Sequence, residues 1–286
     1  MPGLAKAETR SWYRVALATA ADARTLVLAS GEHMGQAIAE AQREVAGSWV
    51  IGVDAATSDQ IPLGESVGKG HVVRLDMTVP PLSTFHWPVG VVPALAGGVA
   101  EAHSGWIERD DDELYVIEAQ TEADQLVDVF LGLVERLPAG DNLEVRLLDH
   151  FDNVGSSDVW LTSRINAKKI IRFLDDHDEE LFGNGHLELS VYLRAQRATL
   201  RLTEHKTVVW LASDRALEGD VVRWLRELAV PQVDALVTVK DAPHFHYRPA
   251  RSRDRKRLGD ELYRERLRRV DTLQPAAAAA RVPRER

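Results

Sequence analysis

Residues 113–137 read ELYVIEAQTEADQLVDVFLGLVERL, and this stretch decides the fold class. Its first eight residues form an apolar run typical of a strand, and Thr121 with Asp124 is typical of the cap that begins a helix. After the cap, apolar residues recur at three- and four-residue spacing and form one helical stripe: Leu126, Val129, Phe130, Leu133, Val134 and Leu137. The stretch is therefore a strand followed by an amphipathic helix, the first part of a βαβ-type unit.

The same layout recurs over 25–54, 158–195 and 206–240, with helices expected over 32–45, 166–181 and 214–230 and a second strand after each helix, the last over 234–240. Strict alternation over 187–193 indicates a half-solvated antiparallel sheet, and 199–205 with 206–212 reads as a hairpin. From 113 to 195 the expected order is β-α-β-β-α-β. We therefore predict an α+β fold of repeated βαβ-type units with mainly antiparallel sheets and a ferredoxin-like arrangement in 113–195.

Composition shifts divide the chain into three parts. Residues 1–104 form an N-terminal α+β unit that ends in a Pro/Gly-rich loop over 80–104. Residues 105–247 form the ferredoxin-like α+β domain with an extra hairpin. Residues 248–286 form a basic tail, with a docked or partner-dependent helix over 258–270 and a disordered end, because its apolar stripe is too thin to fold alone.

The 286 residues are 45% hydrophobic and 28% charged, which is ordinary for a soluble globular protein. The chain has no cysteine, so disulfide scaffolds, thiolate metal sites and cysteine nucleophiles are excluded. The first 14 residues lack the apolar core of a secretory signal, and the weakly polar stretch 89–100 is too short to span a bilayer. We expect a cytoplasmic protein with no membrane partner.

Charge is distributed unevenly along the chain. Residues 247–286 hold 13 basic and 6 acidic residues (+7), so the other 246 hold 22 basic and 38 acidic residues (−16). An acidic body and a basic arm are complementary, which favours a non-enzymatic protein that binds a protein partner or associates with itself. The partner-binding candidates are basic residues of the arm and two tryptophans near the 80–104 loop: Arg248, Arg251, Arg253, Arg255, Lys256, Arg257, Arg264, Arg268, Arg269, Trp87 and Trp106.

One alternative is a nucleic-acid binder that uses the arm over 248–269, since arginine-rich segments bind phosphates. Tyr263 is the single aromatic residue within 248–269, which weakens a base-stacking role. No cofactor is required by either of these functions.

The other alternative is a metal-dependent hydrolase. His244 and His246 follow a predicted strand at two-residue spacing, so both imidazoles point to one face and can begin a metal site. His150 and Asp152, at the end of another predicted strand, are the candidates for completing it. The competing interpretation, surface histidines near an arginine-rich segment, stays open from the sequence.

Other motifs fail on their spacing. Gly64 to Gly70 lacks the four-residue gap and the hydroxyl residue of a phosphate-binding loop. His205 and Thr207 have the H-x-[ST] spacing of the two-histidine phosphoesterases, but the chain has no second copy to act as the partner acid or base. No G-x-S-x-G nucleophile motif occurs.

Overall fold

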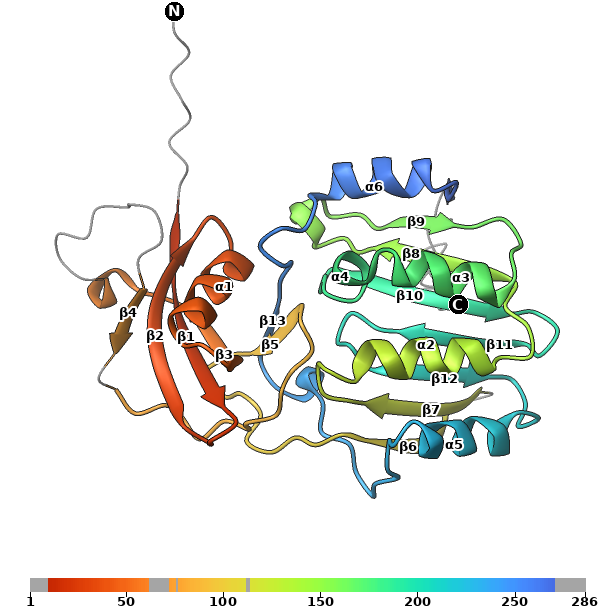
Figure 1. The fold of residues 1–286 in the computed structure, drawn as a ribbon, viewed down its shortest axis with the longest axis horizontal. Helices are drawn as coiled ribbons and strands as arrows, with labels where there is room; N and C mark the ends of the chain where they lie inside the picture. The colour runs from red at the N-terminus through yellow and green to blue at the C-terminus, as the bar shows by residue number, and fades with distance from the viewer. Residues whose placement is uncertain (1–9, 62–71, 76, 112–113, 271–286) are drawn as a thin grey trace, which may run out of the picture.

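The computed structural model describes residues 10–61, 72–75, 77–111 and 114–270. The glycine-rich segment 64–70 and the end of the basic tail beyond 270 lie outside the described residues. Two units lie side by side in Figure 1, a small one built on a four-stranded sheet and a large one built on an eight-stranded sheet, with a two-stranded sheet between them.

The small unit is an antiparallel sheet with one helix. Its strands are ordered β3-β1-β2-β4. Their bounds are β1 Ser11–Thr19, β2 Arg24–Gly31, β3 Ser48–Ala55 and β4 Val72–Leu75, with the short 3-10 helix η1 at Ser58–Gln60. Helix α1, Met34–Glu44, covers one face because Ala37, Ile38 and Ala41 recur on its buried side.

The Pro/Gly-rich loop over 80–104 covers the other face of the small sheet. Leu82 and Leu95 pack on the strands there, and Phe85, Trp87 and Val99 form a further apolar cluster. Within this loop, β5 (Val91–Pro93) pairs antiparallel with β13 (His244–His246), which joins segments far apart in the sequence. The loop is therefore a packed connection between the two units.

The large sheet has the order β14-β9-β8-β10-β11-β12-β7-β6, and neighbouring strands are antiparallel. The strands are β6 Gly105–Asp111, β7 Leu114–Gln120, β8 Asn142–Leu147, β9 Asp158–Leu161, β10 Leu187–Leu193, β11 Ala198–Leu202, β12 Val208–Ala212 and β14 Arg268–Val270. The remaining elements are α2 Leu126–Arg136, α3 Ala167–Asp175, α4 Asp178–Leu181, α5 Glu218–Glu227, α6 Arg255–Arg264, η2 Phe151–Asn153 and η3 Val239–Asp241.

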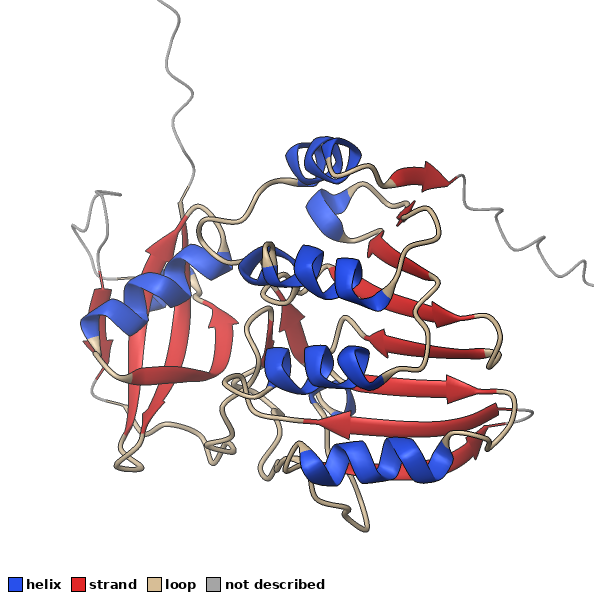
Figure 2. Cartoon of the chain, turned by 45° about the vertical axis from the view of Figure 1, so that its right-hand side comes forward, coloured by secondary structure: helices blue, strands red, loops and turns tan. Residues whose placement is uncertain are grey.

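Helices α2, α3 and α5 cover one face of this sheet (Figure 2), and their apolar stripes form a single core with its strands. Phe130 on α2 and Ile170 on α3 are fully buried in that core. The sequence-based helix over 166–181 divides into α3 and α4, because the chain leaves helical geometry at His177.

The α+β class is confirmed, with helices and antiparallel sheets in both units. The ferredoxin-like arrangement of 113–195 is not confirmed, because β10, β11 and β12 lie between β7 and β8, the two strands that α2 connects. The crossover from β9 through α3 to β10 does enclose the single strand β8. The strand predicted over 234–240 is wrong: Asp234, Ala235 and Val237 are exposed and unpaired in the sheet, and the segment ends in η3.

The basic segment after 248 belongs to the large unit. Leu258 and Leu262 on α6, with Leu267 beyond it, are buried in the same core as the eight-stranded sheet. Strand β14 then pairs with β9 at the edge of that sheet. The segment is therefore part of the packed fold up to residue 270.

Candidate functional site

Five histidines converge where the large sheet meets β13. We call them the histidine cluster: His150, His186, His205, His244 and His246. Strands β8, β10, β11 and β12 are neighbours, so the end of β8, the beginning of β10 and the β11–β12 turn lie at the same end of the strands. That end of the sheet carries the first three histidines, and β13 carries the other two. Neighbouring rings lie 4.9–5.1 Å apart, measured between centroids, for the pairs His150–His186, His150–His246, His205–His244, His205–His246 and His244–His246.

The two β13 histidines aim the same ring nitrogen at each other. The Nδ1 atoms lie 2.7 Å from backbone oxygens, His244 from Ala242 and His246 from Gly185. A carbonyl oxygen only accepts hydrogen bonds, so both Nδ1 atoms carry a proton, and in the neutral form of each ring the Nε2 atom presents a lone pair. These Nε2 atoms are 3.2 Å apart. Two facing lone pairs repel unless a cation, a proton or a metal ion, lies against both.

His205 completes a three-nitrogen set. The ligand atoms of His205, His244 and His246 all lie within 4.8 Å of one another. The β11–β12 turn positions His205 through Lys206, whose φ of 62° closes the turn. The Lys206 ammonium is buried and donates to the Asn184 carbonyl at 2.7 Å, which fixes the turn to the large unit.

A second set overlaps the first. The ligand atoms of His150, Glu204 and His246 also lie within 4.8 Å of one another, and the His150 Nε2 is 3.6 Å from a Glu204 carboxylate oxygen. The His150 Nε2 is buried and has no hydrogen-bond partner among the described residues. Because both sets use His246, they form one polar site with a carboxylate at its side.

Burial lowers the pKa of three imidazoles of the cluster, those of His186, His205 and His246. Burial, opposed by the Gly185 hydrogen bond and assisted by repulsion from His205, lowers the pKa of His246 to about 3. Burial and repulsion from His244 lower the pKa of His205 to about 4, and burial with repulsion from His150 lowers the pKa of His186 to about 4. The neutral imidazole is the form that binds metals. Burial also raises the pKa of the Glu204 carboxyl and lowers that of the Lys206 amine to about 7.

Of the four metal-site residues predicted from the sequence, the structure brings together His244, His246 and His150. Asp152 is used elsewhere: one of its oxygens accepts from the Arg255 backbone N–H at 2.8 Å, and the other lies 3.9 Å from Arg248. Sequence reasoning missed Glu204, His205 and His186. The predicted hairpin of 199–205 with 206–212 places Glu204 and His205 at a strand end. The strand order that brings this turn beside His150 cannot be predicted from any local sequence pattern.

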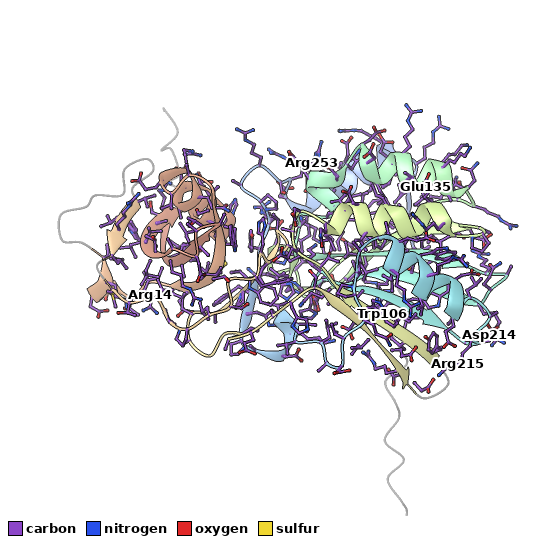
Figure 3. The ribbon with its side chains drawn as sticks, turned by 60° about the horizontal axis from the view of Figure 1, so that its bottom comes forward. Arg14, Trp106, Glu135, Asp214, Arg215 and Arg253 are labelled. Atoms are coloured by element: carbon purple, nitrogen blue, oxygen red, sulfur yellow. The ribbon has the colours of Figure 1, made fainter. Side chains whose placement is uncertain are left out.

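The predicted partner-binding arginines divide into bound and unbound groups. Arg255 is buried and pairs with Asp158, Arg253 (labelled in Figure 3) lies on the surface and pairs with Glu180, and Arg269 also pairs with Asp158. Arg248, Arg257 and Arg264 have acidic neighbours as well, at Asp152, Asp254 and Glu261. No ion pair is recorded within the described ranges for Arg251, Lys256 and Arg268. Much of the arm's charge is thus balanced within the same chain.

The predicted exposure of Trp87 and Trp106 is corrected by the structure. Trp87 is 3% exposed and Trp106, labelled in Figure 3, is 1% exposed. Trp87 packs edge-on against Phe85 in the loop that covers the small sheet, and Trp106 lies in the core of the large unit. Neither indole offers a face to a partner.

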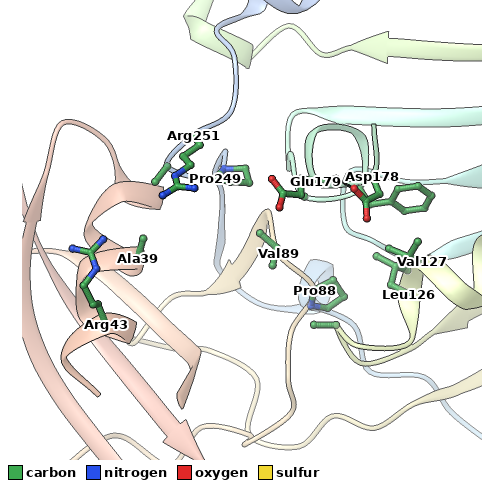
Figure 4. A pocket seen from close by; sticks show the side chains of 14 residues that line it. Ala39, Arg43, Pro88, Val89, Leu126, Val127, Asp178, Glu179, Pro249 and Arg251 are labelled. Atoms are coloured by element: carbon green, nitrogen blue, oxygen red, sulfur yellow. Dashed lines mark hydrogen bonds between the residues drawn. The ribbon is translucent and has the colours of Figure 1, made fainter. Parts of the chain in front are cut away.

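A separate hollow of about 500 Å³ lies between the two units. Figure 4 shows Arg43 and Arg251 on one side of it and Asp178 and Glu179 on the other, above an apolar floor that includes Val89. None of the residues that line it belongs to the histidine cluster. A further group, His177 with Glu261 and Glu265, also brings its ligand atoms within 4.8 Å, but Glu261 already pairs with Arg264.

No protein-family model, curated protein or solved structure matches this chain. Among the described residues, no helix combines the length and apolar character that a membrane crossing requires.

Proposed function

We propose that the chain binds one divalent transition-metal ion, zinc being the best fit, through His205, His244 and His246. The observation that carries this is the pair of Nε2 atoms 3.2 Å apart, each held in place by a Nδ1 hydrogen bond to a backbone carbonyl. Metal-ligating histidines are commonly oriented by such a second hydrogen bond. A set of nitrogen ligands suits zinc, and three ligands leave one tetrahedral position for water.

The arrangement supports hydrolysis as the use of this ion. His205 retains 22% side-chain exposure and Glu204 26%, so the site is accessible from solvent. A Zn²⁺ held there would supply Lewis-acid activation of water, and a nearby carboxylate would serve as the proton acceptor. Glu204 is the candidate acceptor, because a carboxylate oxygen of it lies within 4.8 Å of the donor atom of His246. We therefore propose a metal-dependent hydrolase.

The first experiment is zinc titration of the chelator-treated full chain by calorimetry, with metal content measured by mass spectrometry. We expect one zinc per chain. His246→Ala removes a ligand and is expected to weaken binding by more than about 100-fold, since loss of outer-shell partners alone costs about 10–100-fold. His103→Ala is the matched control, because His103 lies outside both ligand sets and is expected to leave affinity unchanged. Equal affinity in the two variants contradicts the metal site.

The second experiment separates a ligand from a proton acceptor at Glu204. Zinc-loaded protein is assayed with p-nitrophenyl acetate and bis(p-nitrophenyl) phosphate. Glu204→Gln is expected to keep the metal and lose roughly 100-fold or more of the rate, the scale of general-base catalysis. Glu188→Gln is the control, because Glu188 lies on β10 outside both ligand sets. Bound zinc with no hydrolysis of either ester contradicts the hydrolase while leaving the metal site intact.

The assembly function expected from the sequence rested on charge complementarity between body and arm. Ion pairs such as Arg253–Glu180 and Arg255–Asp158 use that complementarity inside one chain. Self-association and a protein partner therefore stay predictions, without an observation in the fold that favours them over the metal site.

A further inference from the structure

A basic hollow lies at the β14 edge of the large sheet, and none of the residues that line it belongs to the histidine cluster. The hollow consists of two adjoining depressions of about 880 and 610 Å³, which share Ser163, Arg266 and Leu267. The first is lined by the end of α6, by β14 and by Trp160 of β9, and the second by α3. We name this surface the β14 hollow.

Positive charge is concentrated in the β14 hollow. Six exposed basic side chains line it, against the carboxylates of Asp176 and Glu265: Lys169, Arg172, Arg264, Arg266, Arg268 and Arg269. The chain as a whole has a net charge of −9, so this patch opposes the charge of the rest of the molecule. Such a patch attracts polyanions.

Half of these cations are free to bind a ligand. Arg172, Arg264 and Arg269 are paired with Asp176, Glu261 and Asp158. Lys169, Arg266 and Arg268 have no ion pair recorded anywhere in residues 10–270 that the structure describes. Arg266 and Arg268 flank the buried Leu267, so the core holds the backbone that carries both guanidinium groups.

Aromatic rings accompany the charges. Tyr263 is 70% exposed, and Trp160, far away in the sequence, lines the same depression. The Trp160 ring packs close to Gly259 of α6, where an added Cβ atom would lie 3.1 Å from it. The sequence shows Tyr263 as an isolated aromatic residue within the basic arm, whereas the fold places the ring of Trp160 in the same depression.

We infer that the β14 hollow binds single-stranded nucleic acid. Proteins that bind single strands combine a positively charged groove for the backbone with aromatic rings on which bases stack. Unpaired arginines and a lysine meet the first requirement, and Tyr263 with Trp160 meets the second. An acidic peptide would use the charges but not the aromatic faces, which is why a nucleic acid is the better fit.

The test is fluorescence anisotropy of the full chain with fluorescein-labelled dT15 between 25 and 200 mM salt. We expect saturable binding whose log affinity falls with log salt at a slope of about −2, from three phosphate contacts at about −0.7 each on a single strand. Arg266→Gln with Arg268→Gln is expected to reduce that slope by about 1.4. Tyr263→Ala is expected to weaken binding about 5-fold or more, the lower end of measured base stacking, and Tyr263→Phe to restore it.

The matched control is Arg223→Gln with Arg226→Gln, which removes the same charge from two exposed positions on α5. The inference is overturned if this control loses as much affinity as the β14 variants, or if dT15 does not bind at 25 mM salt. Competition by polyglutamate at equal charge, with no effect of Tyr263→Ala, would overturn it in favour of an acidic protein partner. Binding in the presence of a chelator, and in His246→Ala, keeps this result independent of the metal site.

Discussion

Arg255 ties the beginning of α6 to the large unit, and its removal is the sharpest test of that packing. Its side chain is 7% exposed. The guanidinium donates to Asp158 at 3.0 Å and to the backbone carbonyls of Leu148 at 2.7 Å, Phe151 at 3.3 Å and Ser156. All but one of its five N–H groups can be used by these four partners. The residue therefore satisfies a carboxylate that is only 14% exposed and three carbonyls at once.

Arg255→Ala is expected to lower the free energy of unfolding by about 3 kcal/mol. Removing one partner of a buried ion pair costs about 3–5 kcal/mol, because the other charge is left uncompensated. Asp158 keeps a second partner in Arg269 at 2.5 Å, which places the expected loss at the lower end of that range. The total free energy of unfolding of a protein domain is about 5–15 kcal/mol, so the change is large.

The assay is urea denaturation followed by circular dichroism, with the slope compared between variants. Arg257→Ala is the matched control on the same helix: its side chain is 79% exposed and, among the described residues, its one ion pair is with Asp254 on the neighbouring turn. The control is expected to cost less than about 0.5 kcal/mol, as exposed pairs do. A loss in Arg255→Ala as small as that of the control would refute the reasoning that α6 is bound through this arginine.

Two other predictions concern the backbone and the pH dependence. Gly185→Ala would place a Cβ 1.8 Å from the Gly90 carbonyl oxygen, so it is expected to destabilise the fold by about 2 kcal/mol or more and to weaken zinc binding by displacing the carbonyl that holds His246. Gly219→Ala, which has open space on α5, is expected to stabilise the fold by up to about 1 kcal/mol. Thermal melts measure the stability of both variants, and zinc titration measures their affinity. Burial and the Glu144 hydrogen bond raise the pKa of Tyr192 to about 12, so the stability that this hydroxyl contributes is fully present below its unfolded pKa of about 10 and is lost as pH rises from 10 through 12. Denaturation across that range should show a smaller loss in Tyr192→Phe, and an unchanged loss would contradict the assignment.

Local patterns predicted most of the secondary structure because each helix and strand buries one face. The stripe from Leu126 to Leu137 is buried against the sheet in α2, and the alternation over 187–193 is that of β10. The pairing of His244 with His246 on one face followed from two-residue spacing alone. These features depend on neighbours a few residues away, which a sequence shows directly.

The order of the strands depends on contacts that no local pattern contains. Strands β10, β11 and β12 separate β7 from β8, and that arrangement, rather than any motif, brings the turn at His205 beside His150. The burial of Trp87 likewise depends on an irregular loop that covers a sheet face without any period. Trp160 and Tyr263 line the same depression because β9 pairs with β14. These misses concern long-range packing between segments with ordinary local sequences.

The histidine cluster also joins the two units. His244 and His246 lie on β13, which pairs with β5, and Phe245 between them packs against the core of the small sheet. His205 and His150 belong to the edge of the large sheet. An ion held by His205, His244 and His246 therefore bridges the units, and a ligand that binds only the docked form stabilises that form by mass action. Metal affinity and the docking of the units are then two measures of one equilibrium, so a substitution that loosens the contact of β5 with β13 should weaken zinc binding without touching any ligand.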